Sequence, residues 1–256
     1  MEVQKLEPRI TNIPKISIIT PSFNQGRYIR DTIESVLNQD YDNWEHIIID
    51  GGSTDETKTI LKEYSHLKWI SEKDMGPANA LNKGFNMADG DVFAWINADD
   101  YYDKNIFRKI ADIFSGNTID ILFGVVTFIY PETGVKDPQI MKEIQLNDLI
   151  HNSADSIRQS GVFFTRDLFN KVGGLDENLK LVFDYDLFIK MLKTGNKKNI
   201  NFNIAYQRMY KETLTKRNLN TQALEIFKVS RKNGARLTDM IMLKSVLRKF
   251  LFPGKF

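Results

Sequence analysis

Two adjacent carboxylates, Asp99 and Asp100, directly follow an apolar run over residues 92–96. A buried strand that stops at acidic residues delivers them to the carboxyl edge of a sheet, where open α/β sheets bind their ligands. Two like charges side by side repel, and burying them without a partner is expensive. A divalent cation is the simplest partner, and oxygen ligands suit Mg²⁺ or Mn²⁺. The pair therefore predicts a metal site, and a solvated Asp-Asp turn is the alternative.

Polar residues also end three earlier predicted strands. Residues 20–24 read Thr-Pro-Ser-Phe-Asn, residues 50–55 read Asp-Gly-Gly-Ser-Thr-Asp, and residues 71–76 read Ser-Glu-Lys-Asp-Met-Gly. The sequence has neither a Gly-x-Gly-x-x-Gly motif nor a Walker-type Gly-Lys-Ser/Thr, so the fingerprints of dinucleotide-binding and P-loop proteins are missing. A nucleoside diphosphate would then need another counter-charge, which a metal held by the paired acids would supply.

Strand and helix patterns alternate along the first hundred residues. We expect strands at 15–20, 44–50, 67–71 and 91–96, and helices at 27–39, 53–64 and 76–88. Pro21 is expected to end the first strand, and Ser53 with Glu56 forms a capping-box pattern that would open the second helix. Strands that alternate with helices imply a parallel sheet with helices on both faces.

The second half of the chain is less regular. We expect helices at 104–114 and 184–193, strands at 119–130 and 161–164, an edge strand at 199–210, and helix from 221 to about 252 with a break at Asn233–Gly234. The stretch 135–158 receives no assignment. Repeats and low-complexity linkers are absent from the sequence, which favours one large domain with a helical C-terminal appendage.

Composition excludes several classes of protein. The 256 residues are 42% hydrophobic, which is ample for a core, and the net charge of +2 gives no global field that would attract nucleic acid. Cysteine is absent, so disulfides and thiolate metal sites are excluded. The chain shows no signal-peptide core and no apolar stretch of membrane-spanning length. These features predict a soluble, cytoplasmic protein.

In this order and spacing the motifs resemble family 2 glycosyltransferases of the GT-A fold, over about residues 16–208, and in particular bacterial enzymes that build O-antigen and capsular repeat units. The resemblance implies an α/β, Rossmann-like, mostly parallel sheet flanked by helices. It also implies a lead-in at 1–14, a catalytic domain at 15–216 and a helical segment at 217–256. Within the domain, residues 15–103 would bind the nucleotide sugar and residues 104–216 the acceptor.

The resemblance assigns nucleotide-sugar binding to Thr20, Pro21, Asn24, Asp50, Asp74, Asn82 and Asp99, and metal binding to Asp99 and Asp100. A carboxylate can accept a hydrogen bond from the imide N–H of uracil, which would give Asp50 a physical role. Many relatives have a second Asp where this chain has Gly51. The alternatives are a turn residue for Asp50, a loop Asp and a helix-surface Asn for Asp74 and Asn82, and capping for Ser53 and Thr54.

A second acidic cluster, Phe-Asp-Tyr-Asp-Leu at 183–187, opens a predicted helix. The family places its general base there, usually in a Glu-Asp pair, so the resemblance makes Asp184 the catalytic base, with Phe183 in place of the Glu. The alternative is a carboxylate that only complements the helix dipole, and Asp186 is interpreted as structural. Tyr210 stands where relatives often carry a His.

The implied reaction is a metal-dependent, inverting transfer from a nucleotide sugar, with UDP favoured, to a glycan or polyprenyl-diphosphate-linked acceptor. One base and no protein nucleophile would give a single displacement. A sugar nucleotidyltransferase and a degenerate, non-catalytic nucleotide-sugar-binding module are the alternatives, the latter because of Gly51, Phe183 and Tyr210. The basic amphipathic segment 236–256 predicts peripheral contact with the inner membrane face, or else a helix docked on the domain.

Overall fold

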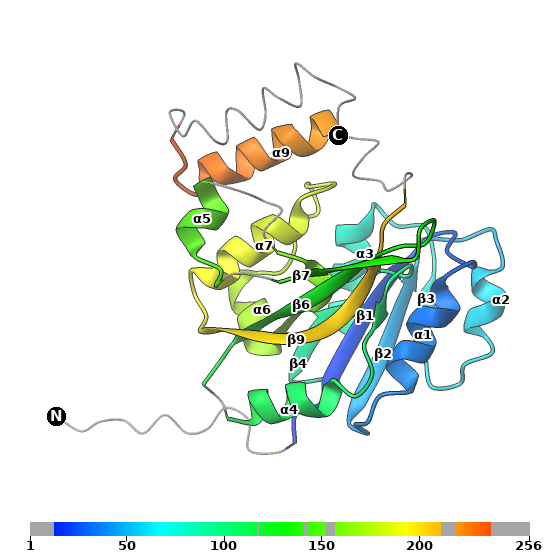
Figure 1. Cartoon of the computed structure of the whole chain (residues 1–256). Helices are drawn as coiled ribbons and strands as arrows, with labels where there is room; N and C mark the ends of the chain where they lie inside the picture. Colours follow the sequence, from blue (N-terminus) through cyan, green and yellow to red (C-terminus); the bar gives the residue numbers. More distant parts are fainter. Residues whose placement is uncertain (1–12, 117, 141–142, 152–156, 211–218, 237–256) are drawn as a thin grey trace.

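The structure is a computed structural model and describes residues 13–116, 118–140, 143–151, 157–210 and 219–236 (Figure 1). These residues form an α/β fold around a single mixed sheet. Its strands are β1 (Ile16–Ser22), β2 (Trp44–Asp50), β3 (Lys68–Ser71), β4 (Val92–Trp95), β5 (Tyr101–Tyr102), β6 (Ile121–Tyr130), β7 (Val135–Gln139), β8 (Val162–Thr165) and β9 (Lys197–Arg208). Their order across the sheet is β3-β2-β1-β4-β8-β6-β9-β5, and β7 pairs with β6.

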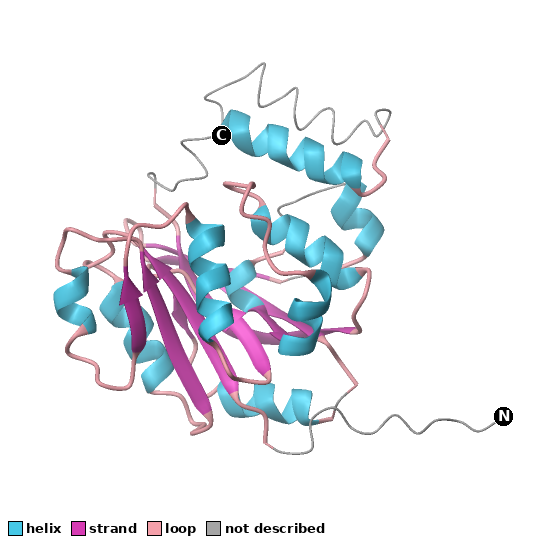
Figure 2. Ribbon diagram, turned by 180° about the vertical axis from the view of Figure 1, so that it is seen from behind, coloured by secondary structure: helices cyan, strands magenta, loops and turns pink. Residues whose placement is uncertain are grey.

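Helices cover both faces of this sheet, as the sequence predicts (Figures 1 and 2). They are α1 (Ile29–Leu37), α2 (Thr57–Leu61), α3 (Pro77–Met87), α4 (Phe107–Ser115), α5 (Leu146–His151), α6 (Arg166–Val172), α7 (Phe183–Leu192) and α9 (Leu219–Lys232). Apolar side chains of α1, α2 and α4 pack on one face, and those of α3, α5, α6, α7 and α9 pack on the other.

The run Ile47–Ile49 shows why β2 lies inside the sheet. Ile48 packs among residues of α1 and α2, whereas Ile47 and Ile49 pack against Ala80 of α3 on the opposite face. Successive side chains of a strand point to opposite faces, so a strand that is apolar at every position must be covered on both. The predicted parallel pairing holds for β3, β2, β1 and β4.

Beyond β4 the sheet becomes mixed. Strand β8 runs antiparallel to both β4 and β6, while β9 is parallel to β6. Strand β9 pairs along one side with β6 and, among the strands of the described ranges, only with the two-residue β5 on its other side. The unassigned stretch 135–158 contributes β7, which extends β6 into a hairpin, and α5. A buried strand is apolar in either direction, so the sequence pattern does not reveal its orientation.

Two sequence expectations about the first loops are wrong. Strand β1 does not end at Pro21 but continues to Ser22, still paired with β2. Pairing of β1 with β4 stops at Ile19, whose carbonyl accepts from the backbone N of Ile96. Alternate residues of a strand direct their N–H groups to the same side, so the N–H that Pro21 lacks would face the unpaired side, where proline is tolerated.

The second error concerns the capping box. Helix α2 begins at Thr57, and the residue before it, Glu56, makes no capping hydrogen bond through its side chain. The hydroxyl of Ser53 instead donates to the carboxylate of Asp50. The carboxylate of Asp55 takes over the local role, since it accepts from the backbone N atoms of Thr57 and Gly26. Ser53 therefore belongs to the loop at the sheet edge rather than to a helix cap.

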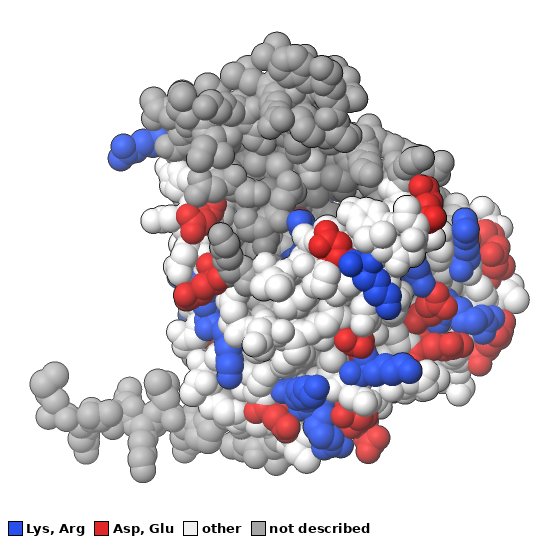
Figure 3. All heavy atoms as spheres, in the orientation of Figure 1, with Lys and Arg blue, Asp and Glu red and all other residues white. Residues whose placement is uncertain are grey.

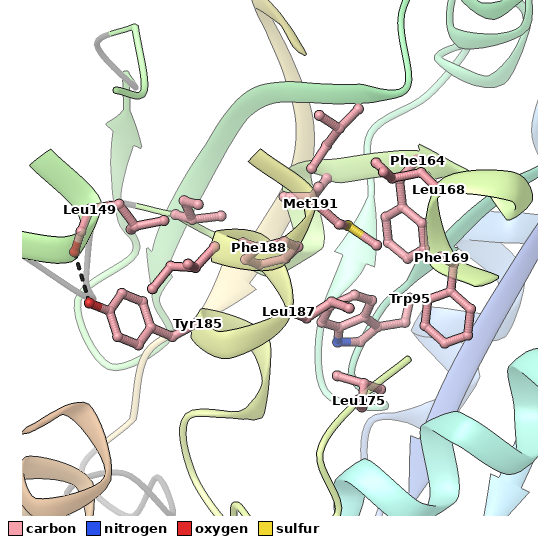
Figure 4. Close-up of a cluster of buried hydrophobic side chains, with 14 of the residues drawn as sticks. Trp95, Leu149, Phe164, Leu168, Phe169, Leu175, Tyr185, Leu187, Phe188 and Met191 are labelled. Atoms are coloured by element: carbon pink, nitrogen blue, oxygen red, sulfur yellow. Dashed lines mark hydrogen bonds between the residues drawn. The ribbon is translucent and has the colours of Figure 1, made fainter. Parts of the chain in front are cut away.

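Helix α9 is docked on the domain, so it shares a core with the region predicted as catalytic. Val229 lies in the largest apolar cluster, and Ser230 Oγ is 2.9 Å from the hydroxyl of Tyr185 on α7. The same hydroxyl donates to the carbonyl of Leu149 on α5 (Figure 4). Residues 237–256 lie outside the described ranges, so most of the predicted amphipathic tail does too. Within the described ranges, none of the helices is both long and apolar enough to span a bilayer.

Candidate active site

The carboxyl ends of four parallel strands bring the predicted motifs to one edge of the sheet. Register places Ser22 beside Asp50, and Asp50 beside Ser71, at the ends of β1, β2 and β3. Strand β4 ends at Trp95, four residues before Asp99, and lies next to β1. The loops after all four strands therefore open on the same side of the molecule, where ligands of such sheets bind.

The loops after β1 and β2 are joined by hydrogen bonds that centre on Asn24. Its backbone N donates to Ser53 Oγ at 2.7 Å, and its side-chain oxygen accepts from the backbone N of Thr54 at 2.9 Å. Asn24 has a φ of 52°, a left-handed conformation that asparagine tolerates better than most residues. These contacts explain the asparagine structurally, while its assignment to nucleotide binding stays a prediction.

Asp50 organises this edge from the interior. Its side chain is 0% exposed. One carboxylate oxygen accepts from the backbone N of Ser53 at 2.9 Å and from Ser71 Oγ at 2.6 Å, and the other accepts from Ser53 Oγ. A carboxylate with both oxygens already bonded inside the protein holds the ends of β2 and β3 together, and it offers little free surface to a ligand.

Thr20 and Pro21 occupy the last part of β1, and Thr20 is also buried. Its hydroxyl lies 2.9 Å from Nε2 of His46 on β2. Burial lowers the pKa of His46 to about 3, so this imidazole is neutral at physiological pH. The side chain of Thr20 therefore forms its contact inside the protein, with a buried neutral imidazole.

Asp74 and Phe23 both approach Gly51, and the space beside Gly51 that these two side chains border is called the slot. A Cβ atom added to Gly51 would lie 2.7 Å from Oδ2 of Asp74 and 3.4 Å from the Phe23 ring. Asp74 is half-buried, and its other oxygen accepts from the backbone N of Gly76 at 2.9 Å. Phe23 is 60% exposed. A carboxylate and an exposed aromatic ring thus lie side by side next to Gly51, and only glycine at position 51 leaves room for the carboxylate.

Asn82 connects the two halves of the domain. Its amide nitrogen donates to the carbonyl of Leu175 at 3.0 Å, and its oxygen accepts from the backbone N of Leu175 at 3.1 Å. Glu177 accepts from both Asn82 and Asn79 at 2.8 Å. The side chain of Asn82 therefore anchors the loop that precedes α7, and its predicted contact with the nucleotide sugar stays untested.

The paired acids after β4 have different environments. Asp99 is half-buried, whereas Asp100 is 1% exposed. Oδ1 of Asp100 accepts from the backbone N of Arg208 at 3.0 Å, and Oδ2 has no hydrogen-bond partner among the described residues. Burial, and next the charge of Asp99, raise the pKa of Asp100 well above its usual value. Only Asp99 presents its carboxylate toward solvent.

The end of β9 is hydrogen-bonded to the acidic loop formed by Asp99 and Asp100. The guanidinium of Arg208 donates to the carbonyl of Asp99 at 2.5 Å and pairs with Asp31. It lies 5.1 Å from the ring centre of Tyr28 and 4.9 Å from that of Tyr101. Two residues later, the hydroxyl of Tyr210 donates to Oδ2 of Asp99. Tyr210 therefore contacts the carboxylate of Asp99, one of the two predicted metal ligands.

Asp184 lies in the first turn of α7, half-buried, and its Oδ1 accepts from the backbone N of Tyr185 at 2.8 Å. One helical turn later, Phe188 stacks on Trp95 with ring centres 5.6 Å apart (Figure 4). This packing joins the helix that carries Asp184 to the strand that precedes Asp99. Asp186 is buried, and its carboxylate lies 2.6 Å from Nζ of Lys190, in agreement with its structural interpretation.

A residue that sequence reasoning missed fixes the start of α7. The carboxylate of Glu225 on α9 is buried and accepts from three consecutive backbone N atoms, of Lys180, Leu181 and Val182, at 2.9, 2.9 and 3.3 Å. Phe23, Tyr28 and Arg208 were missed in the same way. An exposed Phe beside a strand end was a usable signal, whereas the role of Glu225 has no local signature because its partners lie 43 to 45 residues away.

The candidate metal ligands supply only oxygen atoms, which fits Mg²⁺ or Mn²⁺. Within the described ranges, groups of three or more His, Cys, Asp or Glu side chains that could hold a metal are absent. The half-exposed carboxylate of Asp99 and the unpartnered oxygen of Asp100 are the available donors. Such a pair is incomplete without further oxygen donors, which a bound diphosphate would provide.

Comparison with known proteins agrees with this architecture. A sequence model of the family described as Glycosyl transferase family 2 matches residues 17–218. An uncharacterized glycosyltransferase of Rickettsia typhi is 31% identical over 199 residues, which cover 73% of this chain and 61% of that protein. The chondroitin synthase of Escherichia coli is 28% identical over 244 residues, covering 89% of this chain and 34% of the synthase.

The fold also matches a solved structure. TarS residues 1–349 of S. aureus, in complex with UDP, superimposes with a TM-score of 0.68 and 20% identity, over 93% of this chain and 72% of that one. This chain spans about three fifths of the length of the first curated relatives that it matches.

Proposed function

Because the chain belongs to glycosyl transferase family 2, we propose that it transfers a sugar from a UDP-sugar to a glycan or polyprenyl-diphosphate-linked acceptor in the synthesis of a surface polysaccharide such as O-antigen or capsule. One observation carries the proposal: the half-exposed carboxylate of Asp99 opens on the same sheet edge as the slot beside Gly51. An extended nucleoside diphosphate can span this edge, with its base at β2–β3 and its phosphates at β4. The UDP complex of TarS and the likeness to a chondroitin synthase support the donor and product classes.

Few side chains are needed to bind the nucleotide-sugar donor. Asp99, and next Asp100, would hold Mn²⁺ or Mg²⁺, which when bound neutralises charge on the departing diphosphate. Phe23 offers an exposed ring on which a base can stack. Arg208 holds the backbone carbonyl of Asp99 and so keeps the acidic loop in place. Asp50 acts indirectly, since its hydrogen bonds fix the ends of β2 and β3.

The acceptor half centres on Asp184. As general base it would take the proton from an acceptor hydroxyl while that oxygen attacks the anomeric carbon and the nucleoside diphosphate leaves. A single displacement without a protein nucleophile inverts the anomeric centre, and the two-carboxylate arrangement of glycosidases is not needed because the leaving group is already activated. Asn82 and Glu177 position the loop that leads into this helix.

The alternatives differ from this proposal in testable features. A sugar nucleotidyltransferase would need a Gly-rich, Arg-containing loop after β1, which residues 20–25 do not provide, and the family match favours transfer of the sugar. A non-catalytic binding module was suggested by Gly51, Phe183 and Tyr210. The close approach of Asp74 gives Gly51 a specific use in this chain, so its presence is not a sign of decay.

The test needs no knowledge of the acceptor, because water can replace it. We expect UDP-sugars, among a panel of UDP-, GDP- and dTDP-sugars, to raise the melting temperature in the presence of Mn²⁺. We also expect slow Mn²⁺-dependent hydrolysis of a UDP-sugar, reduced about 100- to 10,000-fold in Asp184→Asn, with UDP affinity unchanged. Asp167→Asn, in the first turn of α6, is the matched control. Hydrolysis at the wild-type rate in Asp184→Asn would place the base elsewhere.

A further inference from the structure

The slot formed by Gly51, Asp74 and Phe23 contains a carboxylate oxygen that the protein itself leaves without a hydrogen bond among the described residues. Oδ1 of Asp74 is bonded to the backbone N of Gly76. Oδ2 approaches the α-carbon side of Gly51 so closely that a Cβ atom there would lie 2.7 Å away. Among the described residues, Oδ2 has no hydrogen-bond partner, and the side chain is half-exposed. It is therefore an unpaired acceptor that lies beside Gly51, directly after β2.

We infer that Asp74, and not Asp50, reads the base of the donor by accepting a hydrogen bond from the imide N–H of uracil. The inference rests on the proposed function, since it names the residue that distinguishes one nucleotide from another in the same donor site. Asp50 is 0% exposed, and both its oxygens are already bonded within the protein. Of the two carboxylates near the ends of β2 and β3, Asp50 and Asp74, it is Asp74 that has an oxygen without a hydrogen-bond partner among the described residues.

Gly51 is the second residue on which this recognition of the base depends. At this position a side chain would occupy the space into which the Asp74 carboxylate now extends. The φ angle of Gly51 is not in the left-handed region, so the backbone does not require glycine there. The glycine is required by the approach of Asp74. The carboxylate that many relatives would supply from position 51 is supplied here from the loop after β3.

The chemistry of the base gives the site its selectivity. Uracil has a hydrogen on N3, whereas N3 of cytosine is an unprotonated acceptor that a carboxylate repels. The exposed ring of Phe23, 3.4 Å from the Cβ position of Gly51, would support either pyrimidine by stacking. Stacking therefore contributes affinity, and the Asp74 carboxylate contributes discrimination.

Titration calorimetry with UDP and CDP, at one fixed Mn²⁺ concentration, tests the assignment. We expect wild type to prefer UDP by about 10- to 100-fold, the range for one hydrogen bond to a charged group. In Asp74→Asn the preference should fall to less than about threefold, mainly through weaker UDP binding. Glu72→Gln removes an exposed carboxylate from the same loop, where it pairs with Lys83, and should keep the wild-type ratio.

A carboxylate-exchange variant separates base recognition from loop stability. Gly51→Ala should displace the Asp74 carboxylate and lower the UDP preference as Asp74→Asn does. The double variant Gly51→Asp with Asp74→Ala returns a carboxylate to the slot from the other side and should restore the preference, which a merely structural role for Asp74 would not predict. Asp50→Asn should weaken UDP and CDP binding together, without changing their ratio.

The outcomes are distinguishable. If wild type prefers UDP but Asp74→Asn keeps that preference, or only Asp50→Asn loses it, the assignment to Asp74 is wrong while the proposed function stands. If wild type binds CDP as well as UDP, the imide is not read and the inference fails. If wild type binds neither nucleotide with Mn²⁺, the proposed donor class fails, and this inference fails with it.

Discussion

Removal of the Tyr210 hydroxyl should strengthen metal-dependent binding of UDP. This hydroxyl donates to Oδ2 of Asp99, a carboxylate oxygen that is a predicted ligand of a divalent cation. A proton donor and a cation cannot share one lone pair, so metal binding must displace or weaken this bond. Burial, and next the charge of Asp99, raise the pKa of Tyr210, so the phenol remains a donor across the usual assay range.

The size of the effect follows from the exposure of the two groups. A hydrogen bond to a charged group contributes about 1.5 to 3 kcal/mol. Asp99 and Tyr210 are both half-buried, so water replaces part of that contact and about 1 kcal/mol is a better figure. That corresponds to roughly a fivefold lower Kd for UDP with Mn²⁺ in Tyr210→Phe. The free protein should lose a similar amount of unfolding free energy.

The substitution is a clean one because the ring stays in place. Tyr210 stacks on Tyr28 with centres 5.7 Å apart and planes at 10°, and Phe preserves that stack. Calorimetric titration of UDP, with Mn²⁺ present and absent, gives the affinities. Tyr206→Phe is the matched control, since Tyr206 lies in β9 four residues before Tyr210 and its hydroxyl donates to Asp103 at 3.4 Å rather than to Asp99.

The competition has a specific signature. The higher UDP affinity of Tyr210→Phe should appear only with metal present, and Tyr206→Phe should leave UDP affinity at the wild-type value. Weaker binding of UDP and Mn²⁺ by Tyr210→Phe would show that the hydroxyl contacts the bound complex and does not compete with it. An equal gain without metal would show that the phenol obstructs the nucleotide itself.

Three further predictions follow from other parts of the structure. Glu225→Gln should lower kcat without changing UDP affinity, because the Glu225 carboxylate holds the backbone just before α7. It should also lower the unfolding free energy by about 1 to 3 kcal/mol. A variant with unchanged kcat and unchanged stability would contradict this. Burial, and next the charge of His66, lower the pKa of His46 to about 3. Below pH ~6.5 the imidazole of His46 therefore binds a proton in the unfolded chain but stays neutral in the folded protein. Stability should be full above that pH and fall by about 1.4 kcal/mol per pH unit toward pH 3, and urea titrations at pH 7 and 5 should show a smaller loss in His46→Gln. If segment 236–256 binds membranes, charge reversal of its Lys and Arg residues should abolish salt-sensitive co-sedimentation with anionic vesicles, at about 1 kcal/mol per residue, and full binding by that variant excludes the segment. In the view of Figure 3, the described surface carries acidic and basic side chains intermixed, so an effect confined to this segment would be specific.

The sequence was most informative where structure is local. The bounds predicted for β2 agree with those observed, and β3, β4, α3 and α7 begin and end within a residue or two of their predicted bounds. Each is a short apolar or amphipathic run between turn residues. The ordered motifs at the strand ends also identified the family, which the family match confirms.

Packing decided what the motifs do at their own positions. Ser53 fitted a capping box equally well, but its hydroxyl is bonded to Asp50, because the two residues lie together at the buried edge of β2. In the sequence, Gly51 stands where many relatives have a second Asp. In the structure, the carboxylate of Asp74 extends into the space that this glycine leaves. A sequence pattern gives residue types and spacing, whereas free lone pairs depend on which neighbours are already bonded.

The sequence by itself determined the fold class, the family and the sheet edge at which the candidate site lies, since strand periodicity and strand-end acids are short-range properties. Only the tertiary structure decided which carboxylates remain available. Asp99 meets Tyr210 across 111 residues, and Asn82 meets Leu175 across 93. These contacts form only after the second half of the sheet and α7 have packed against the first, and no local pattern encodes them.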